Sequence, residues 1–365
     1  MNADINQQIC SLSDDIFRPH AQEADQGNIA GRVGQNIRLL ANSGFFGLGI
    51  PKEFGGMEAD EETRREYLET IASACGVTAF VQQQLHAGGG FVGGVEDDSL
   101  RKEWLPRFAS GEQLCGVAFS HLRRPGPPAV TAREVTGGYI INGTAPWVTG
   151  WSLLDAFILG ASIPESDSHV FVVVRKGIQI DFLTPSLPIP LAVMNASDTV
   201  ILTINEMFIP KRDVLYMRPA DSLRHSDLCG VTGHVFLPLG CVRGSIWLLR
   251  SLAERPGKYA LTAVADAFQI EADACRREAL RWNGSCVDLA DYKQRSTNAR
   301  SAAIFLAMRA AHAAVTASAG SGILLSNPAQ RLLREAVFYT TTAQTADVQA
   351  STLDLLISPT CWQVD

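Results

Sequence analysis

The spacing of apolar residues changes twice along this chain, and that change limits the fold more than any other sequence feature. In residues 1–115 apolar side chains recur at helical spacing, and Gly44 and Pro51 mark the end of one such helix. Residues 116–222 hold short runs rich in Val, Ile, Phe and Thr between Gly, Pro, Asp and Ser, which is typical of antiparallel strands. Residues 223–365 return to long Ala-rich helical segments. We therefore predict an α+β multidomain protein: an N-terminal all-α domain, a middle antiparallel β-barrel or sheet domain, and a C-terminal four-helix bundle.

Charge and cysteine usage exclude several classes of function. The formal net charge is −7 and the pI is about 5.6, which argues against nucleic acid and membranes as partners because clustered Lys and Arg bind both. No uninterrupted apolar run approaches the roughly 20 residues of a spanning helix, and the first residues lack the pattern of a secretion signal. We therefore expect a cytoplasmic protein. The eight cysteines form no C-x-x-C pair, so we expect reduced thiols and no metal site.

The stretch GTAPWVTGW, residues 143–151, contains a candidate binding surface. Alternate side chains of an extended strand point to the same face, so we expect Trp147, Thr149 and Trp151 on one side. An indole is a flat, polarisable wall for a ring-shaped ligand, and a hydroxyl can donate a hydrogen bond to it. The alternative is that both tryptophans fill the core of the β domain.

Five segments carry a family resemblance, and they occur in the same order as in that family. They are LLANSGFFGLGIPKEFGG (39–56), EWLPRFASGEQLCGVAFS (103–120), GGYIINGTAPWVTG (137–150), SDTVILTINEMFIPKRDVL (197–215) and AGSGILLSNPAQRLLREA (319–336). Together they resemble the acyl-CoA dehydrogenase superfamily. The resemblance implies the same three-part fold, FAD bound between the β domain and the bundle, and usually a dimer of dimers. A homodimer or homotetramer is therefore expected.

The resemblance also implies cofactor-binding residues in the β domain. Trp147 and Thr149 match the family's W-x-T strand, which lies beside the flavin, whereas Trp151 is expected in the core or on the surface. Phe119 and Ser120 match the other wall of the flavin site, where Ser replaces the usual Thr and keeps a hydroxyl donor.

Three further positions near the C-terminus match cofactor contacts of the family. Thr345 corresponds to a threonine that helps to hold the cofactor, and Gly320 and Gly322 correspond to a glycine turn beside the FAD. For the two glycines a helix-ending turn is the alternative, since Gly adopts positive φ readily.

The glutamate that such enzymes use to remove an α-proton is missing from its usual place. Counted without gaps from Pro328 and Arg334, this position falls on Ala343, and matched through Tyr339 it falls on Thr340. Neither side chain can act as a base.

A second group in the family carries the glutamate on the first helix of the bundle. The matching position here is Gly233 or His234, and residues 230–253 contain no Asp or Glu. His234 is therefore the titratable candidate for the base, with a core histidine as the alternative. Asp347, one helical turn beyond Ala343, is a weaker substitute.

Three other departures concern the ligand phosphates. The loop Glu-Pro-x-x-Gly-Ser-Asp of the family is replaced by HLRRPGPPAV (121–130), a family arginine is Asn195, and the Arg-x-x-Phe-Gly motif is absent from AERPGKYALTAV (253–264). These changes weaken the expectation of CoA binding and open the question of whether FAD is retained.

Three functional alternatives remain after these departures. The first is an FAD-dependent oxidoreductase that acts on the CH–CH group of a small-molecule substrate, an acyl-CoA thioester or a similar compound. The second is a flavin-dependent monooxygenase on the same fold, which needs no α-proton base. The third is a catalytically silent homologue that serves as a binding subunit.

Overall fold

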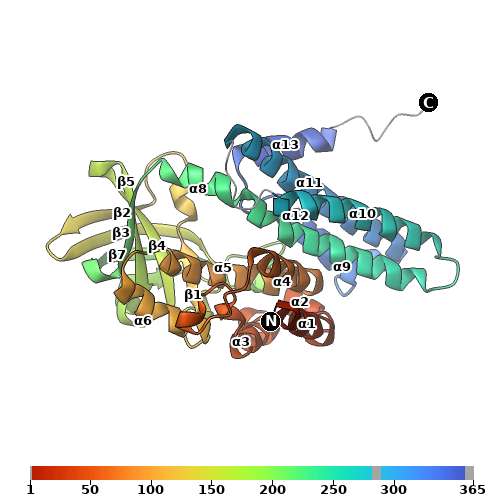
Figure 1. The fold of residues 1–365 in the computed structure, drawn as a ribbon, viewed down its shortest axis with the longest axis horizontal. Coiled ribbons are helices and arrows are strands. Elements are labelled where there is room, and N and C mark those ends of the chain that lie inside the picture. Colours follow the sequence, from red (N-terminus) through yellow and green to blue (C-terminus); the bar gives the residue numbers. More distant parts are fainter. Residues whose placement is uncertain (1, 282–288, 358–365) are drawn as a thin grey trace.

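The computed structural model describes residues 2–281 and 289–357, and the chain folds into three adjoining parts (Figure 1). The first part is helical, as the sequence predicts, and carries α1 (Asn2–Leu12), α2 (Ala21–Gln26), α3 (Gly34–Asn42), α4 (Glu61–Ala74), α5 (Gly76–Gly93) and α6 (Asp98–Ala109). Side-chain caps mark where α4 and α6 begin. The side chain of Asp60, for example, accepts the backbone N–H of Thr63 at 2.8 Å at the start of α4.

The second part is a twisted sheet with a short helix, α7 (Lys176–Gln179), beside it. Its strands are β1 (Cys115–Ala118), β2 (Val130–Val135), β3 (Gly138–Val148), β4 (Ala156–Ile163), β5 (Ser168–Arg175), β6 (Leu183–Pro185), β7 (Val200–Pro210) and β8 (Val214–Pro219). The strand order is β6-β7-β3-β2-β4-β5-β8, and β1 pairs with β4.

The prediction of a purely antiparallel sheet is wrong, because two strand pairs are parallel. β4 lies parallel to β1 and to β2, while the other pairs are antiparallel. Every residue of β4 is buried, which is typical of a strand covered on both faces. Strand composition does not reveal pairing direction, since direction depends on which connection crosses the sheet.

The third part is the predicted helical bundle. It contains α8 (Ser222–Gly230), α9 (Phe236–Ala253), α10 (Ala260–Arg281), α11 (Leu289–Ser318), α12 (Pro328–Tyr339) and α13 (Ala346–Ile357). The central helix α9 contacts α10, α11 and α12, and α13 packs on α11. In Figure 1, α8 lies between the sheet and the rest of the bundle. The helix α8 therefore connects the second part to the third and lies between them.

Small residues bring α9 close to α4 of the first part. A Cβ at Gly240 would lie 2.4 Å from the Cβ of Ala72, and one at Gly244 would lie 2.6 Å from the carbonyl oxygen of Ser73. Larger side chains at these two positions would push the helices apart. Glycine therefore fixes the distance at which the bundle docks on the N-terminal helices.

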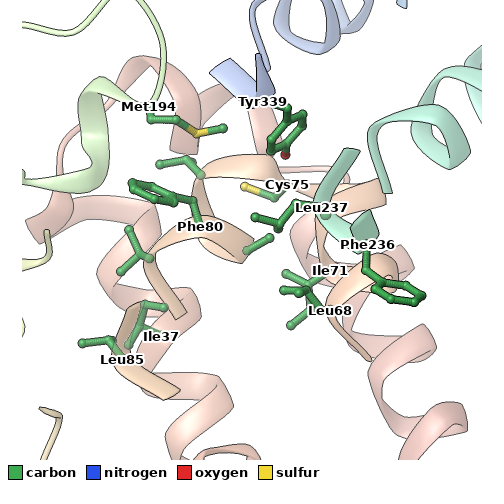
Figure 2. Packing of buried hydrophobic residues seen from close by; sticks show 14 of the residues in the cluster. Ile37, Leu68, Ile71, Cys75, Phe80, Leu85, Met194, Phe236, Leu237 and Tyr339 are labelled. Carbon is green, nitrogen blue, oxygen red and sulfur yellow. The ribbon is translucent and has the colours of Figure 1, made fainter. Parts of the chain in front are cut away.

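One continuous core joins the three parts. Figure 2 shows Ile71, Cys75 and Phe80 of the first part packed near Leu237 of α9 and Tyr339 of α12. The same cluster of buried side chains extends through the sheet. The helical segments and the sheet that the sequence separates therefore share one interior, since each needs the others to bury its apolar face.

A buried ion pair lies within this core. The guanidinium of Arg331 donates to the carboxylate of its i+4 neighbour Glu335 at 2.5 Å, and both side chains are almost fully buried. Glu335 also accepts the backbone N–H of Gly76 at 3.1 Å. Burial raises the pKa of the Glu335 carboxyl, and the Arg331 charge opposes that rise. The pair thus ties α12 to the start of α5.

Two helical stretches within the described residues are long and apolar enough to cross a membrane by composition alone. In the apolar 18-residue window of Val231–Ala253, 78% of the residues are buried within the protein, and in that of Asp291–Ile323 39% are. The first stretch includes the central helix of the bundle, whose burial accounts for its composition.

Candidate functional site

The strand that contains Trp147 does not keep the alternation expected from its sequence. Trp147 has a φ of +63°, and the pairing of β3 with β7 shifts register between Ala145 and Val148. This irregularity is a β-bulge, which redirects side chains. The indole of Trp147 is consequently 45% exposed, whereas Thr149 and Trp151 are buried. The prediction that the three side chains share one face is therefore wrong.

The two buried members of that stretch have partners inside the protein. The hydroxyl of Thr149 lies 3.0 Å from that of Thr199, which lies 2.8 Å from the hydroxyl of Ser197. Trp151 packs against Phe157 and beneath the ammonium of Lys176. Trp151 thus lies in the core. The hydroxyl of Thr149 is hydrogen-bonded to that of Thr199, the residue before β7.

Ser120 and Trp147 lie side by side. The exposed hydroxyl of Ser120 donates to the carbonyl of Pro146, the residue before Trp147, at 3.4 Å. Phe119 is half-buried beside the rings of Phe91 and Phe171. The segment after the end of β1 and the bulge of β3 therefore meet, which brings the exposed Trp147 and the exposed Ser120 to neighbouring positions.

His121 fixes the turn Ser120–Arg123 and was not singled out from the sequence. The imidazole is buried, and its Nε2 lies 2.9 Å from the carbonyl oxygen of Gly160 in β4, so Nε2–H is the donor. Burial lowers the pKa of His121 to about 4. The ring is therefore neutral at pH 7 and anchors the turn that carries Ser120.

Arg123 connects this turn with the bundle. Its guanidinium donates two hydrogen bonds, both of 2.7 Å, to the carboxylate of Asp227 in α8. The same guanidinium lies 5.4 Å from the ring centroid of Phe119. A bidentate pair of this kind has a defined geometry, so it fixes α8 relative to the edge of the sheet that carries Ser120.

His234, the candidate base, lies in the turn Val231–Val235 before α9. Burial, followed by the charges of Arg300, Arg65 and Arg123, lowers the pKa of His234 to about 3. A group with such a pKa is a poor proton acceptor near neutral pH. Its Nδ1 is buried and has no hydrogen-bond partner among the described residues. His234 is thus a neutral hydrogen-bonding group rather than an acid or base.

Arg300 of α11 joins the two positions that the resemblance gives for the missing glutamate. It donates to the carbonyl of His234 on one side, and to those of Tyr339 at 3.4 Å and Thr342 at 3.1 Å on the other. Tyr339 is the last residue of α12, and Thr342 directly precedes Ala343. The sequence signal for this role is a single charged residue, Arg300, next to the apolar run of α11. It was not among the predicted site residues.

The remaining predicted side chains have local partners. Asp347 is 54% exposed and forms an ion pair with Lys293 at 2.8 Å. The hydroxyl of Thr345 accepts the backbone N–H of Val348 at 3.3 Å and so caps α13. Ala343 has a φ of +49° and is exposed. Among these three, Asp347 is a surface carboxylate and Thr345 a helix cap.

Gly320 and Gly322 lie at the other end of α12. The helix separates them from Thr345 by its 12 residues, about 18 Å at 1.5 Å per residue. A Cβ at Gly322 would lie 2.7 Å from the carbonyl oxygen of Val315, so this glycine allows a tight turn after α11. Within one chain this arrangement agrees with a helix-ending turn.

An exposed indole and an exposed hydroxyl here could hold a flat heterocyclic ring. Trp147 and Ser120 supply them, and the Ser120 hydroxyl donates to the carbonyl of Pro146, the residue before Trp147. His234, whose Nδ1 has no partner among the described residues, is close enough to Arg123 for that charge to lower its pKa. The predicted ring-binding pair is therefore brought together, whereas the glycine turn is not brought to the same place.

Comparisons with known proteins agree with the architecture. The family of the acyl-CoA dehydrogenase N-terminal domain matches residues 3–112. The chain is 25% identical over 326 residues to the mitochondrial short-chain specific acyl-CoA dehydrogenase of Mus musculus, covering 82% of this chain and 76% of that protein. It is 27% identical over 188 residues to the 3-(aryl)acrylate reductase of Clostridium sporogenes, covering 49% of each. In that second alignment the chain spans about half the length of its relative.

A solved structure shows the same fold over nearly the whole chain. Butyryl-CoA dehydrogenase from Megasphaera elsdenii superimposes with a TM-score of 0.80 and 18% sequence identity, covering 97% of this chain and 98% of that one. The helical first part, the central sheet and the final bundle occur in the same order in both. The match of the N-terminal domain, the relatives aligned across the chain and this shared fold agree with one another: residues 3–112 match the acyl-CoA dehydrogenase N-terminal domain, and the whole chain has the fold of an acyl-CoA dehydrogenase.

Proposed function

We propose that the protein is an FAD-dependent oxidoreductase that acts on the CH–CH group of a small-molecule substrate. The observation that carries this proposal is the exposed indole of Trp147, directed outward by a left-handed backbone beside the Ser120 hydroxyl. A non-glycine residue with positive φ is uncommon and is retained where the surrounding structure requires it. Bound FAD would supply the acceptor for a hydride. Trp147 would stack on its ring, and Ser120 would donate a hydrogen bond to the ring edge.

The absence of a carboxylate narrows the chemistry. Ala343, Thr340 and Gly233 cannot accept a proton, and the depressed pKa of His234 keeps that imidazole neutral. A dehydrogenation of the proposed kind therefore lacks its usual protein base at both positions. This favours, as the second candidate, a flavin-dependent monooxygenase, whose chemistry needs no α-proton acceptor on the protein. The acyl-CoA substrate remains a proposal that rests on the family alone.

The proposed function is tested first by cofactor binding. The purified protein is incubated with FAD, passed through gel filtration and examined by visible absorption. We expect flavin bands that co-elute with the protein. A colourless protein that does not bind added FAD would refute both oxidoreductase proposals and favour the catalytically silent homologue.

Restoring a carboxylate tests whether the base alone has been lost. In Ala343→Glu the new side chain enters an exposed position whose backbone is already left-handed, so no new backbone strain is introduced. We expect butyryl-CoA to bleach the bound flavin at least about 10²-fold faster than in the wild type, the usual contribution of a general base. Thr341→Glu in the same exposed turn is the matched control and should show no gain. If the rate of flavin bleaching in both variants equals that of the wild type, the site lacks more than the base.

We also propose that the bundle pairs with another copy of this chain, giving a homodimer or homotetramer. Ile270 of α10 is 71% exposed, and Leu324 and Leu325, between α11 and α12, are 55% and 62% exposed. Large apolar side chains left exposed on a helical bundle favour a protein interface. Sedimentation equilibrium should give a mass at least twice 39.4 kDa, and a monomer at micromolar concentration would contradict the proposal.

A further inference from the structure

Arg300 is a buried charge without a carboxylate partner among the described residues. It is 2% exposed, and its acceptors are three backbone carbonyls. Arg331, the other arginine as deeply buried, pairs with Glu335. Burying a charge without an opposite charge is unfavourable, and burial indeed lowers the pKa of Arg300 to about 10. The packing of the core alone therefore does not explain why an arginine occupies this position.

The three acceptors come from two segments that are far apart in the sequence. One is the turn of His234, before α9, and the other runs from the end of α12 to Thr342. These segments contain both positions at which the family carries its glutamate. The carbonyls at the end of a helix have no partners within it and carry a partial negative charge. The guanidinium can therefore hold both segments at once, which a neutral donor with fewer N–H groups cannot do.

Polar atoms without partners gather along the segments that Arg300 holds. The Nδ1 of His234 and the Oε1 of Gln344 are buried and have no hydrogen-bond partner among the described residues. Gln344 is two residues beyond Thr342, whose carbonyl Arg300 binds. Buried polar atoms are nearly always satisfied, so these two require a partner that this chain does not supply.

We propose that Arg300 is a positioning residue of the active site, which holds the His234 turn and the segment 339–344 together and thereby presents the neutral His234 imidazole and the Gln344 amide to the substrate. The proposal deepens the proposed function and rests on it, because it treats the two glutamate positions as the substrate cleft. Arg300 touches backbone rather than substrate. Its second effect is electrostatic, since its charge opposes protonation of the nearby imidazole.

The charged groups near His234 are identified on each element that packs against it. They are Arg300 of α11, Arg65 of α4, and Arg123 of the turn Ser120–Arg123. Arg65 is paired with Glu61, and Arg123 with Asp227. Arg300 is the one of the three without a carboxylate among the described residues, so its removal should change the field at His234 most.

The experiment follows His234 by NMR in protein labelled with ¹³C at histidine Cε1, with and without FAD. His234→Gln identifies the signal, and the pH is varied from 3 to 8. In the wild type we expect a titration midpoint for His234 near pH 3. In Arg300→Met we expect its pKa to rise by about one unit or more, the usual effect of removing a nearby like charge, and in Arg300→Lys we expect it to stay low.

Arg309→Met is the matched control, since Arg309 lies on the same helix, is exposed and pairs with Glu271. It should leave His234 unchanged. A folded Arg300→Met protein in which the titration midpoint of His234 equals that of the wild type would overturn the proposal, as would an equal shift in Arg309→Met. If Arg300→Met does not fold, a rise in Arg300→Lys equal to that expected for Met overturns it instead. Because the titration is read without flavin, failure to bind FAD would refute the proposed function separately.

Discussion

Trp147→Ala should raise the dissociation constant for FAD about tenfold. In the free protein the indole is 45% exposed beside Ser120, so its removal leaves the packing of the sheet largely intact. An aromatic stacking contact contributes about 0.5–1.5 kcal/mol beyond the apolar area that it covers, and 1.4 kcal/mol corresponds to a factor of ten. Fluorescence titration with FAD gives the two dissociation constants.

Trp247 provides a matched control for this substitution. It is 46% exposed, lies on α9 and packs beneath the guanidinium of Arg18. Trp247→Ala removes the same side chain with the same exposure and should leave FAD binding unchanged. Equal dissociation constants for the Trp147 variant and the wild type would show that the indole does not stack on a flavin.

Glu335→Ala should lower the free energy of unfolding by about 3–5 kcal/mol, because it leaves the Arg331 charge buried without a partner. The substitution also removes the acceptor of the Gly76 N–H. Urea denaturation followed by circular dichroism measures the difference.

The control for Glu335→Ala is Glu271→Ala. Glu271 pairs with Arg309 on the surface, where both side chains are more than 40% exposed. Exposed pairs contribute about 0–1 kcal/mol, so this variant should be nearly as stable as the wild type. If the two variants lose the same stability, the buried pair does not hold α12 against α5.

The fold could be predicted because it rests on local periodicity. Helical spacing, then short β-branched runs, then Ala-rich helices reproduce the order of the three parts in the structure. The spacing of apolar residues in each segment shows which face is buried, since a helix or strand buries one face against the core. The pairing of β4 with β1 and β2 in parallel could not be predicted, because it depends on connections that pass over the sheet.

The candidate site was predicted only in part. The structure brings Ser120 to the carbonyl of Pro146, next to Trp147, but the bulge at Trp147 turns Thr149 to the opposite side. One extra residue in a strand exchanges its faces, and neither composition nor spacing marks it. His121 was missed because its function depends on a carbonyl in β4, at Gly160.

The sequence by itself determined the order of helices and strands and the absence of a glutamate at both positions that the family resemblance indicates, and it proposed Trp147 and Ser120 as cofactor contacts. The tertiary structure alone decided that Arg300 joins the His234 turn to the end of α12, and that burial together with the charges of three arginines keeps His234 neutral. The reason is physical. Periodicity reports burial, which each segment shows locally, whereas hydrogen bonds and electrostatic fields depend on groups that come together only when distant segments pack.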